Sequence, residues 1–192
     1  MKIKPLSEVD EIIQNRNFSK QSLEDQEFTS FLFKSCDFSE TSLRNTKFCA
    51  TVFENCNFSL SVFDNCRLQD VQFVNCKIVG AHFYKCAPTF FSPSFDKCLL
   101  HYCNFSDMDM KNASFKNSKL FENHFNNTKL RGADFSYANL SGTLFHHCDL
   151  SQADFSTAIC YTIDPTANKI KKAKFSFPEA LGLLHSFDIK LV

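Results

Sequence analysis

The sequence predicts an all-β fold, a four-sided solenoid with a helical cap at its C-terminal end. Two observations lead to this class: large apolar residues recur at every fifth position, and small residues recur two positions before them. A period of five fits neither an α-helix, which repeats every 3.6 residues, nor a strand, which alternates every two. It fits a coil of short segments, each of which turns one large and one small side chain inward before a turn.

The five-residue period runs through most of the chain in two registers. Every fifth residue from Phe18 to Phe83 is large and apolar, and after a shift of two residues the pattern continues from Phe95 to Phe155. These positions hold 17 of the 24 phenylalanines. Four units make a 20-residue coil, so residues 16–160 predict roughly seven coils stacked at about the 4.8 Å spacing of paired strands. From residue 95 onward aromatic and aliphatic residues alternate, which predicts phenylalanine on two opposite faces.

The turns are marked by residues two positions after each large one. Asparagine and glycine recur there, and both tolerate the tight backbone of a turn. The residues of this kind are Asn45, Asn55, Asn65, Asn75, Asn112, Asn117, Asn127, Gly80, Gly132 and Gly142.

The ten cysteines follow the same period. Seven of them occupy the small inward position, and no CxxC pair with zinc-site spacing occurs. Cys36, Cys56 and Cys76 are 20 residues apart and are expected to stack, close enough for a disulfide. We expect free thiols instead, because cysteine also serves as a small apolar residue in a reduced interior.

Composition excludes several classes of protein. Lys+Arg and Asp+Glu both total 21, so the chain lacks the positive excess of an overall basic nucleic-acid binder. No run of 18 apolar residues is present, so we expect no membrane span. The first residues lack the apolar segment of a signal peptide, and we expect a cytoplasmic protein.

The sequence offers no chemistry of catalysis. It contains no nucleophile with a plausible base, no glycine-rich phosphate loop and no paired carboxylates, and a filled rod lacks a substrate pocket. We therefore expect no enzyme activity and no cofactor. In the triplet His146-His147-Cys148 the three side chains are expected to point to solvent, to a turn and to the interior, so we expect no metal site.

Two runs carry a family resemblance. Residues 133–142 (ADFSYANLSG) and 152–156 (QADFS) resemble the A(D/N)LXX signature of pentapeptide-repeat proteins. The resemblance covers residues 16–160 and implies a right-handed quadrilateral β-helix. The tail from Ile163 to Ala180 resembles the topoisomerase-protecting members, which are Qnr-type quinolone-resistance proteins and immunity proteins against albicidin or microcin. This implies a non-enzymatic protein that binds DNA gyrase or topoisomerase IV as a DNA-like rod and protects it from quinolones.

Both ends of a solenoid need a cap, because they expose unpaired backbone. Residues 1–15 are expected to form an N-terminal cap, as a short helix or an irregular lid, and residues 161–192 a C-terminal cap. Ser176 and Glu179 have capping-box spacing, with Pro178 in the first turn of the expected helix and a strand-like tail from Phe187 to the end.

The C-terminal cap has two interpretations. It covers the last coil of a monomer, or it joins two chains in a homodimer, which symmetry favours and the family resemblance implies. The residues expected at the dimer interface are Leu181, Leu184, Phe187, Ile189 and Leu191.

The register break at residues 84–94 also has two interpretations. Its two prolines remove backbone donors, so the segment is either a bulge plugged by phenylalanines or a protrusion that contacts a partner. Apolar residues at outward positions one coil away support the contact site. The candidate partner-binding residues are Leu60, Val62, Val79, Tyr84, Phe90 and Phe91.

Charge leaves the mode of action open. Residues 17–160 carry 13 Lys/Arg and 15 Asp/Glu, which is weakly acidic for a mimic of DNA, and the offset at the break decides whether the carboxylates form one stripe. The alternative function is a structural scaffold for an unrelated protein partner. Nucleic-acid contact through the cap lysines is a third interpretation; we expect no direct nucleic-acid binding, because a lysine cluster is more often a solvated face. These lysines are Lys169, Lys171, Lys172 and Lys174.

Overall fold

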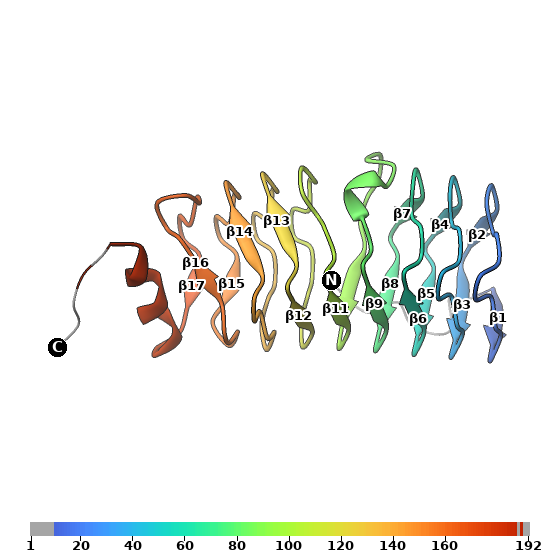
Figure 1. Ribbon diagram of the computed structural model, residues 1–192, viewed down its shortest axis with the longest axis horizontal. Coiled ribbons are helices and arrows are strands. Elements are labelled where there is room, and N and C mark those ends of the chain that lie inside the picture. Colours follow the sequence, from blue (N-terminus) through green and yellow to red (C-terminus); the bar gives the residue numbers. More distant parts are fainter. Residues whose placement is uncertain (1–9, 188, 190–192) are drawn as a thin grey trace.

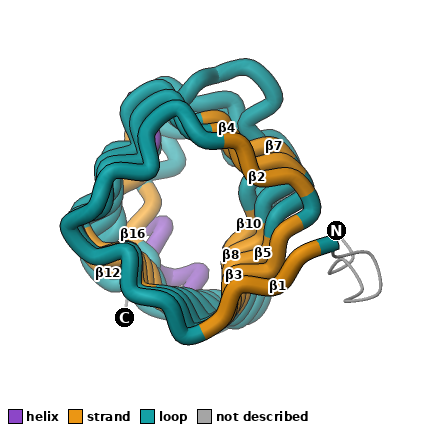
Figure 2. The backbone as a smooth tube through the Cα atoms, turned by 90° about the vertical axis from the view of Figure 1, so that its right-hand side faces the viewer, coloured by secondary structure: helices purple, strands orange, loops and turns teal. Residues whose placement is uncertain are grey.

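The protein is a parallel β-helix of about eight turns (Figure 1). The computed structural model describes residues 10–187 and residue 189. Seen along the rod, successive coils superpose and form a four-sided outline (Figure 2). The predicted all-β, right-handed quadrilateral solenoid is confirmed. None of the helices in the described residues is long and apolar enough to cross a membrane.

The first face holds the longest sheet. Its strands pair in parallel in the order β1-β3-β5-β8-β10, and a second sheet, β15-β17, follows on the same face. Their bounds are β1 (Glu11–Gln14), β3 (Phe31–Lys34), β5 (Val52–Glu54), β8 (Gln72–Val74), β10 (Ser94–Asp96), β15 (Asp154–Phe155) and β17 (Lys174–Phe175).

The other three faces carry shorter sheets and isolated bridges. On the second face lie β6 (Asn57–Ser59), β9 (Lys77–Val79), β11 (Leu99–His101) and β12 (Lys119–Phe121). On the third lie the 3₁₀ turn η2 (Phe83–Lys85), β13 (His124–Asn126), β14 (Leu144–His146) and β16 (Thr162–Ile163). On the fourth lie β2 (Glu27–Thr29), β4 (Lys47–Cys49) and β7 (Arg67–Gln69).

Stacked phenylalanines fill the interior. On the first face the ring of Phe33 stacks on that of Phe53 with centroids 5.1 Å apart, and the stack continues to Phe175. On the opposite, third face Phe105 and Phe125 stack at 4.9 Å. Leu100 and Leu120 pair on the second face between them. The predicted alternation of aromatic and aliphatic faces is confirmed.

The small inward position is a hydrogen-bonding position as well as a packing position. The hydroxyl of Thr41 donates to the backbone carbonyl of Phe18 at 2.7 Å, 23 residues earlier. The thiol of Cys56 makes the equivalent contact with the carbonyl of Phe33 at 3.4 Å. Threonine, serine and cysteine therefore exchange there because each is small and each supplies a donor to a buried carbonyl.

The turns lie where the sequence predicts them. All ten asparagines and glycines of the turn column have positive φ, between 52° and 73°. Larger residues also occupy this column, among them Leu60, Tyr102 and Tyr137, with φ between 53° and 61°. Side chains held in this conformation point away from the rod, which explains why three bulky residues stand exposed at its corners.

The register break is a single coil with two extra residues. Phe73 pairs with Phe95, 22 residues later, whereas Phe53 pairs with Phe73 at the regular 20. The extra residues bulge from the fourth face (Figure 2). Pairing on the first three faces continues across the break.

The solenoid extends beyond both expected boundaries. Strand β1 lies within residues 1–15, where a cap was expected, and its Ile13 pairs with Phe33 in the inward column. At the other end the inward stack continues to Phe175. The expected C-terminal helix is the 3₁₀ helix η3 (Glu179–Phe187), in which the N–H of Ala180 donates to the backbone carbonyl of Ser176.

Candidate partner-binding surface

Three candidate contact residues meet at the corner between the second and third faces. The backbone N–H of Leu60 donates to the carbonyl of Val79 at 2.8 Å, so the two residues lie on adjacent coils. Leu60 is 60% exposed. Together with Val62, Gly80 and His82 it lines a groove of about 270 Å³. Because Gly80 has no side chain, the Leu60 side chain lies over the next coil.

Tyr84 extends this surface across the third face. It lies in η2, is 44% exposed, and its ring packs edge-on against the His82 ring with centroids 5.7 Å apart. Leu60, Val62, Val79 and Tyr84 thus form one apolar surface, which we call the corner patch. Such a patch on a soluble rod is a candidate contact site.

Phe90 and Phe91 lie around the next corner, in the bulge of the fourth face. Phe90 is 63% exposed, with the Arg67 guanidinium 6.0 Å from its ring centroid. Phe91 is only 9% exposed and packs against Phe83 inside the rod. The structure therefore separates these two residues from the corner patch and places Phe91 as a plug of the interior.

The third face carries further aromatic and imidazole side chains that the sequence interpretation did not include. The rings of His101 and Tyr102 stack at 4.0 Å beside the corner patch. Further along, a groove of about 330 Å³ is lined by His124, Leu144 and His146. The spacing of 20 or 22 residues between these positions and Leu60 or His82 is the signal that places them on one face.

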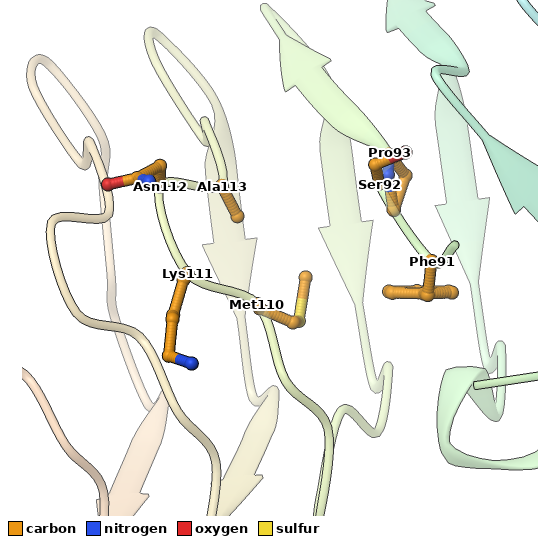
Figure 3. Close-up of a pocket in the computed structure, with 7 residues that line it drawn as sticks. All are labelled: Phe91, Ser92, Pro93, Met110, Lys111, Asn112 and Ala113. Carbon is orange, nitrogen blue, oxygen red and sulfur yellow. The ribbon is translucent and has the colours of Figure 1, made fainter. Parts of the chain in front are cut away.

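A second hollow lies in the fourth face, next to the bulge. Phe91, Ser92 and Pro93 form one side, and residues 110–113 form the other, around a cavity of about 350 Å³ (Figure 3). Phe91, Pro93, Met110 and Ala113 are buried and make its wall apolar. The cavity exists because the bulge carries the chain away from the position that a regular coil would fill.

The carboxylates form no single stripe. Outward acids occur on every face, for example Glu54 on the first, Glu40 near the second, Asp64 on the third and Asp109 on the fourth. Nine lysine– or arginine–carboxylate pairs lie within 4 Å, most of them between adjacent coils. The surface is therefore a mosaic of neutralised charges.

Asp154 shows how a pair of coils is tied together. Burial alone would raise the pKa of Asp154, but hydrogen bonds from Ser156 and from the Lys174 ammonium outweigh it and lower this pKa to about 2. The Lys174 ammonium lies 2.9 Å from the carboxylate. The same aspartate accepts the N–H of Ser156, which fixes the turn entry and explains the Asp or Asn of the repeat signature.

The thiols and imidazoles do not converge on a metal. Cys148 points inward and donates to the carbonyl of Phe125 at 3.1 Å, whereas His146 and His147 are exposed. The described residues contain no cluster of three or more potential ligands. All ten cysteines are free, and burial raises the pKa of the Cys66, Cys76 and Cys86 thiols.

The sequence matches one family model. The model is described as the pentapeptide repeat region, and it matches residues 26–90 and 87–155. The chain belongs to the pentapeptide-repeat family. No curated protein matches its sequence.

The pentapeptide-repeat rod is similar to solved structures at low identity. Two trypsin-treated forms of QnrB1, a plasmid-mediated fluoroquinolone resistance protein, match with TM-scores of 0.64 and 0.69. Both are 17% identical, and the matches cover 94% and 96% of this chain and 98% of each QnrB1 chain. HetL, involved in heterocyst differentiation regulation in the cyanobacterium Nostoc sp. strain PCC 7120, matches at 15% identity and TM-score 0.53, over 88% of this chain and 87% of its own.

The C-terminal end of this pentapeptide-repeat rod exposes apolar side chains. Leu183 packs on the core, while Leu181, Phe187 and Ile189 are exposed and Leu184 is half-buried. Leu191, also expected at a dimer interface, lies outside the described residues. The helix thus has one side on the last coil and another side available for contact.

Proposed function

We propose that this protein binds a type II topoisomerase, DNA gyrase or topoisomerase IV, and protects it from inhibitors such as quinolones. It acts as a non-enzymatic binding protein in the cytoplasm. The observation that supports this most is the end-to-end likeness to QnrB1, a fluoroquinolone resistance protein, over 96% of this chain and 98% of that one. The resemblance of the C-terminal tail to topoisomerase-protecting members points the same way.

The interior favours a binding role. Phenylalanine and leucine fill it from end to end, so contacts with a partner fall to the outer surface. The corner patch supplies exposed apolar side chains of the kind that anchor protein interfaces. We assign the partner contact to Leu60, Val62, Val79 and Tyr84, with Phe90 at the edge of the bulge.

The charge distribution favours local contacts over imitation of a phosphate backbone. DNA presents a regular line of negative charge, whereas the carboxylates here lie on all four faces and many are paired with lysine or arginine. The rod in our proposal shares the width of a duplex, and the corner patch supplies the recognition. The same neutral surface favours a second candidate function, a scaffold for an unrelated protein.

We further propose that two rods join through their C-terminal segments. Leu181, Phe187 and Ile189 are exposed, and Leu184 lies beside them in the same segment. A two-fold axis would bury this side of η3 against its copy. Sedimentation equilibrium of wild type and of Phe187→Asp tests the proposal: the wild type should be a dimer and the variant a monomer. A monomeric wild type would contradict it.

A supercoiling assay tests the main proposal. Purified protein is added to gyrase with relaxed plasmid, with and without a fluoroquinolone. Restored supercoiling in the presence of the drug, or inhibition in its absence, at roughly micromolar protein supports the proposal. Indifference at tens of micromolar with both gyrase and topoisomerase IV would leave the scaffold function.

A further inference from the structure

The C-terminal half of the fourth face carries an excess of positive charge. Six cations stand on it against the two carboxylates of Asp109 and Asp149. The cations are Lys111, Lys129, Arg131, Lys169, Lys171 and Lys172. This concentration contrasts with the neutral chain as a whole, whose lysine and arginine total equals its acid total.

The two carboxylates neutralise only part of this charge. Asp109 pairs with the Lys111 and Lys129 ammonium groups at 3.2 and 3.5 Å. A hydrogen bond from Ser151, with the charges of Lys169 and Arg131, lowers the pKa of Asp149. The outer column of Lys111, Arg131 and Lys171 has no column of acids beside it, and a hollow of about 350 Å³ runs between Arg131, Gln152 and Lys171.

This cationic hollow continues directly from the apolar cavity at the bulge. Lys111 and Asn112 form the rim of the apolar cavity, and the N–H of Asn112 donates to the carbonyl of Arg131 on the next coil at 2.9 Å. From Lys111 to Lys171 is three coils, or about 14 Å, which about four residues of an extended chain span.

The backbone beside the apolar cavity is also free to pair. One coil further on, the N–H of Lys129 donates to the carbonyl of Met108 at 2.9 Å, as a parallel ladder requires. At the equivalent position of the preceding coil, the N–H and carbonyl of Asp109 have no hydrogen-bond partner in the part of the chain that the structure describes. The bulge has removed the strand that they would meet.

We propose that this face binds an extended acidic peptide segment of a partner protein, with one apolar side chain in the cavity lined by Phe91 and Met110. Three features define the occupant: the cavity takes an apolar side chain, the cationic column takes the carboxylates that follow it, and Asp109 offers backbone groups for strand addition. This site is separate from the corner patch and holds whatever the partner there is.

A peptide fits this face better than a nucleic acid does. The Asp109 and Asp149 carboxylates interrupt the cations and would repel successive phosphates, and a nucleic acid has no apolar side chain for the cavity. Nucleic-acid binding is accordingly an outcome that the experiment distinguishes.

Fluorescence polarisation with the purified protein tests the proposal. The probe is a labelled hexapeptide of one phenylalanine followed by five alternating glutamates and aspartates. Comparison probes replace the phenylalanine by serine, or the acids by their amides, and a labelled 12-base-pair DNA duplex is the fourth. The test variant is Arg131→Glu with Lys171→Glu. Its matched control is Lys77→Glu with Lys119→Glu, the same charge change at exposed positions of the second face.

The acidic probe should bind, the serine probe should bind about tenfold more weakly, and the amide probe and the duplex should not bind. The test variant should lose about tenfold or more in affinity, and the control variant less than about twofold, with thermal unfolding showing both folded. Equal losses in the two variants, equal binding of the serine probe, or binding of the duplex that the test variant abolishes would overturn the proposal.

Discussion

Phe73 and Phe95 stack with ring centroids 5.2 Å apart, although the coil that joins them is two residues longer than its neighbours. The interior is therefore continuous across the register break, and the irregularity is confined to the outside of the fourth face. This relationship makes the break a surface feature on an intact rod. It also divides the neighbouring phenylalanines of the bulge into one inside and one outside.

Truncation of phenylalanines on the two sides of this boundary should give opposite results. Phe95→Ala removes a fully buried ring and should lower the free energy of unfolding by about 3–5 kcal/mol. Phe90→Ala removes an exposed ring and should cost less than about 1 kcal/mol. Urea unfolding followed by circular dichroism measures both. A large loss for Phe90→Ala would show that the bulge packs into the core.

The sequence predicted the interior of the rod and missed features that depend on the neighbouring coil. The five-residue count places Phe95 inward, but it assigns no direction to Phe90 or Phe91, because the break suspends the register. The cavity beside Met110 arises from a missing strand, which no local pattern encodes. Ile13, in contrast, stands five residues before Phe18, so the early start of the solenoid was visible in the count and was overlooked.

Thiol reactivity should follow burial. Cys160 is exposed and Cys49 half-buried, whereas the other eight thiols are buried. Thiol reagents attack the thiolate, and burial raises the pKa of Cys103 to about 12, so such thiols stay protonated near neutral pH. With Ellman's reagent the folded protein should release one equivalent rapidly and a second slowly, and unfolded protein all ten. Rapid labelling of several thiols in the folded state would contradict a solid interior.

Removal of a buried hydroxyl should stabilise the protein. The Tyr161 hydroxyl is buried and has no hydrogen-bond partner among the described residues. Tyr161→Phe deletes this unsatisfied group and should raise the free energy of unfolding by about 1 kcal/mol. Tyr137→Phe, which alters an exposed tyrosine, is the control and should change it by less than about 0.5 kcal/mol. Destabilisation by Tyr161→Phe alone would reveal a partner for the hydroxyl.

The Asp154–Lys174 pair should make stability depend on acid pH. The pKa of Asp154 is about 2 in the folded protein, below its ordinary value of 3.8, so its contribution is complete above about pH 5 and is lost as pH falls toward 2. Asp154→Asn should therefore destabilise by about 1 kcal/mol at pH 7, a figure reduced for the exposure of Lys174, and by almost nothing at pH 2.

Asp134→Asn is the control for that experiment. Asp134 accepts the same hydrogen bonds from Ser136, without an ion pair within 4 Å in the described part of the chain. Its effect at pH 7 should be smaller than that of Asp154→Asn. A pH-independent loss in Asp154→Asn would assign the whole effect to the turn and none to the charge.

The most direct test of the account compares two matched double variants in the gyrase supercoiling assay with a fluoroquinolone. Leu60→Glu with Tyr84→Ala alters the corner patch, and Leu144→Glu with Tyr137→Ala makes the same changes at exposed positions elsewhere on the rod. Wild type and the second variant should restore supercoiling at roughly micromolar protein, and the first should need at least about tenfold more. Equal protection by both variants would contradict action through the corner patch.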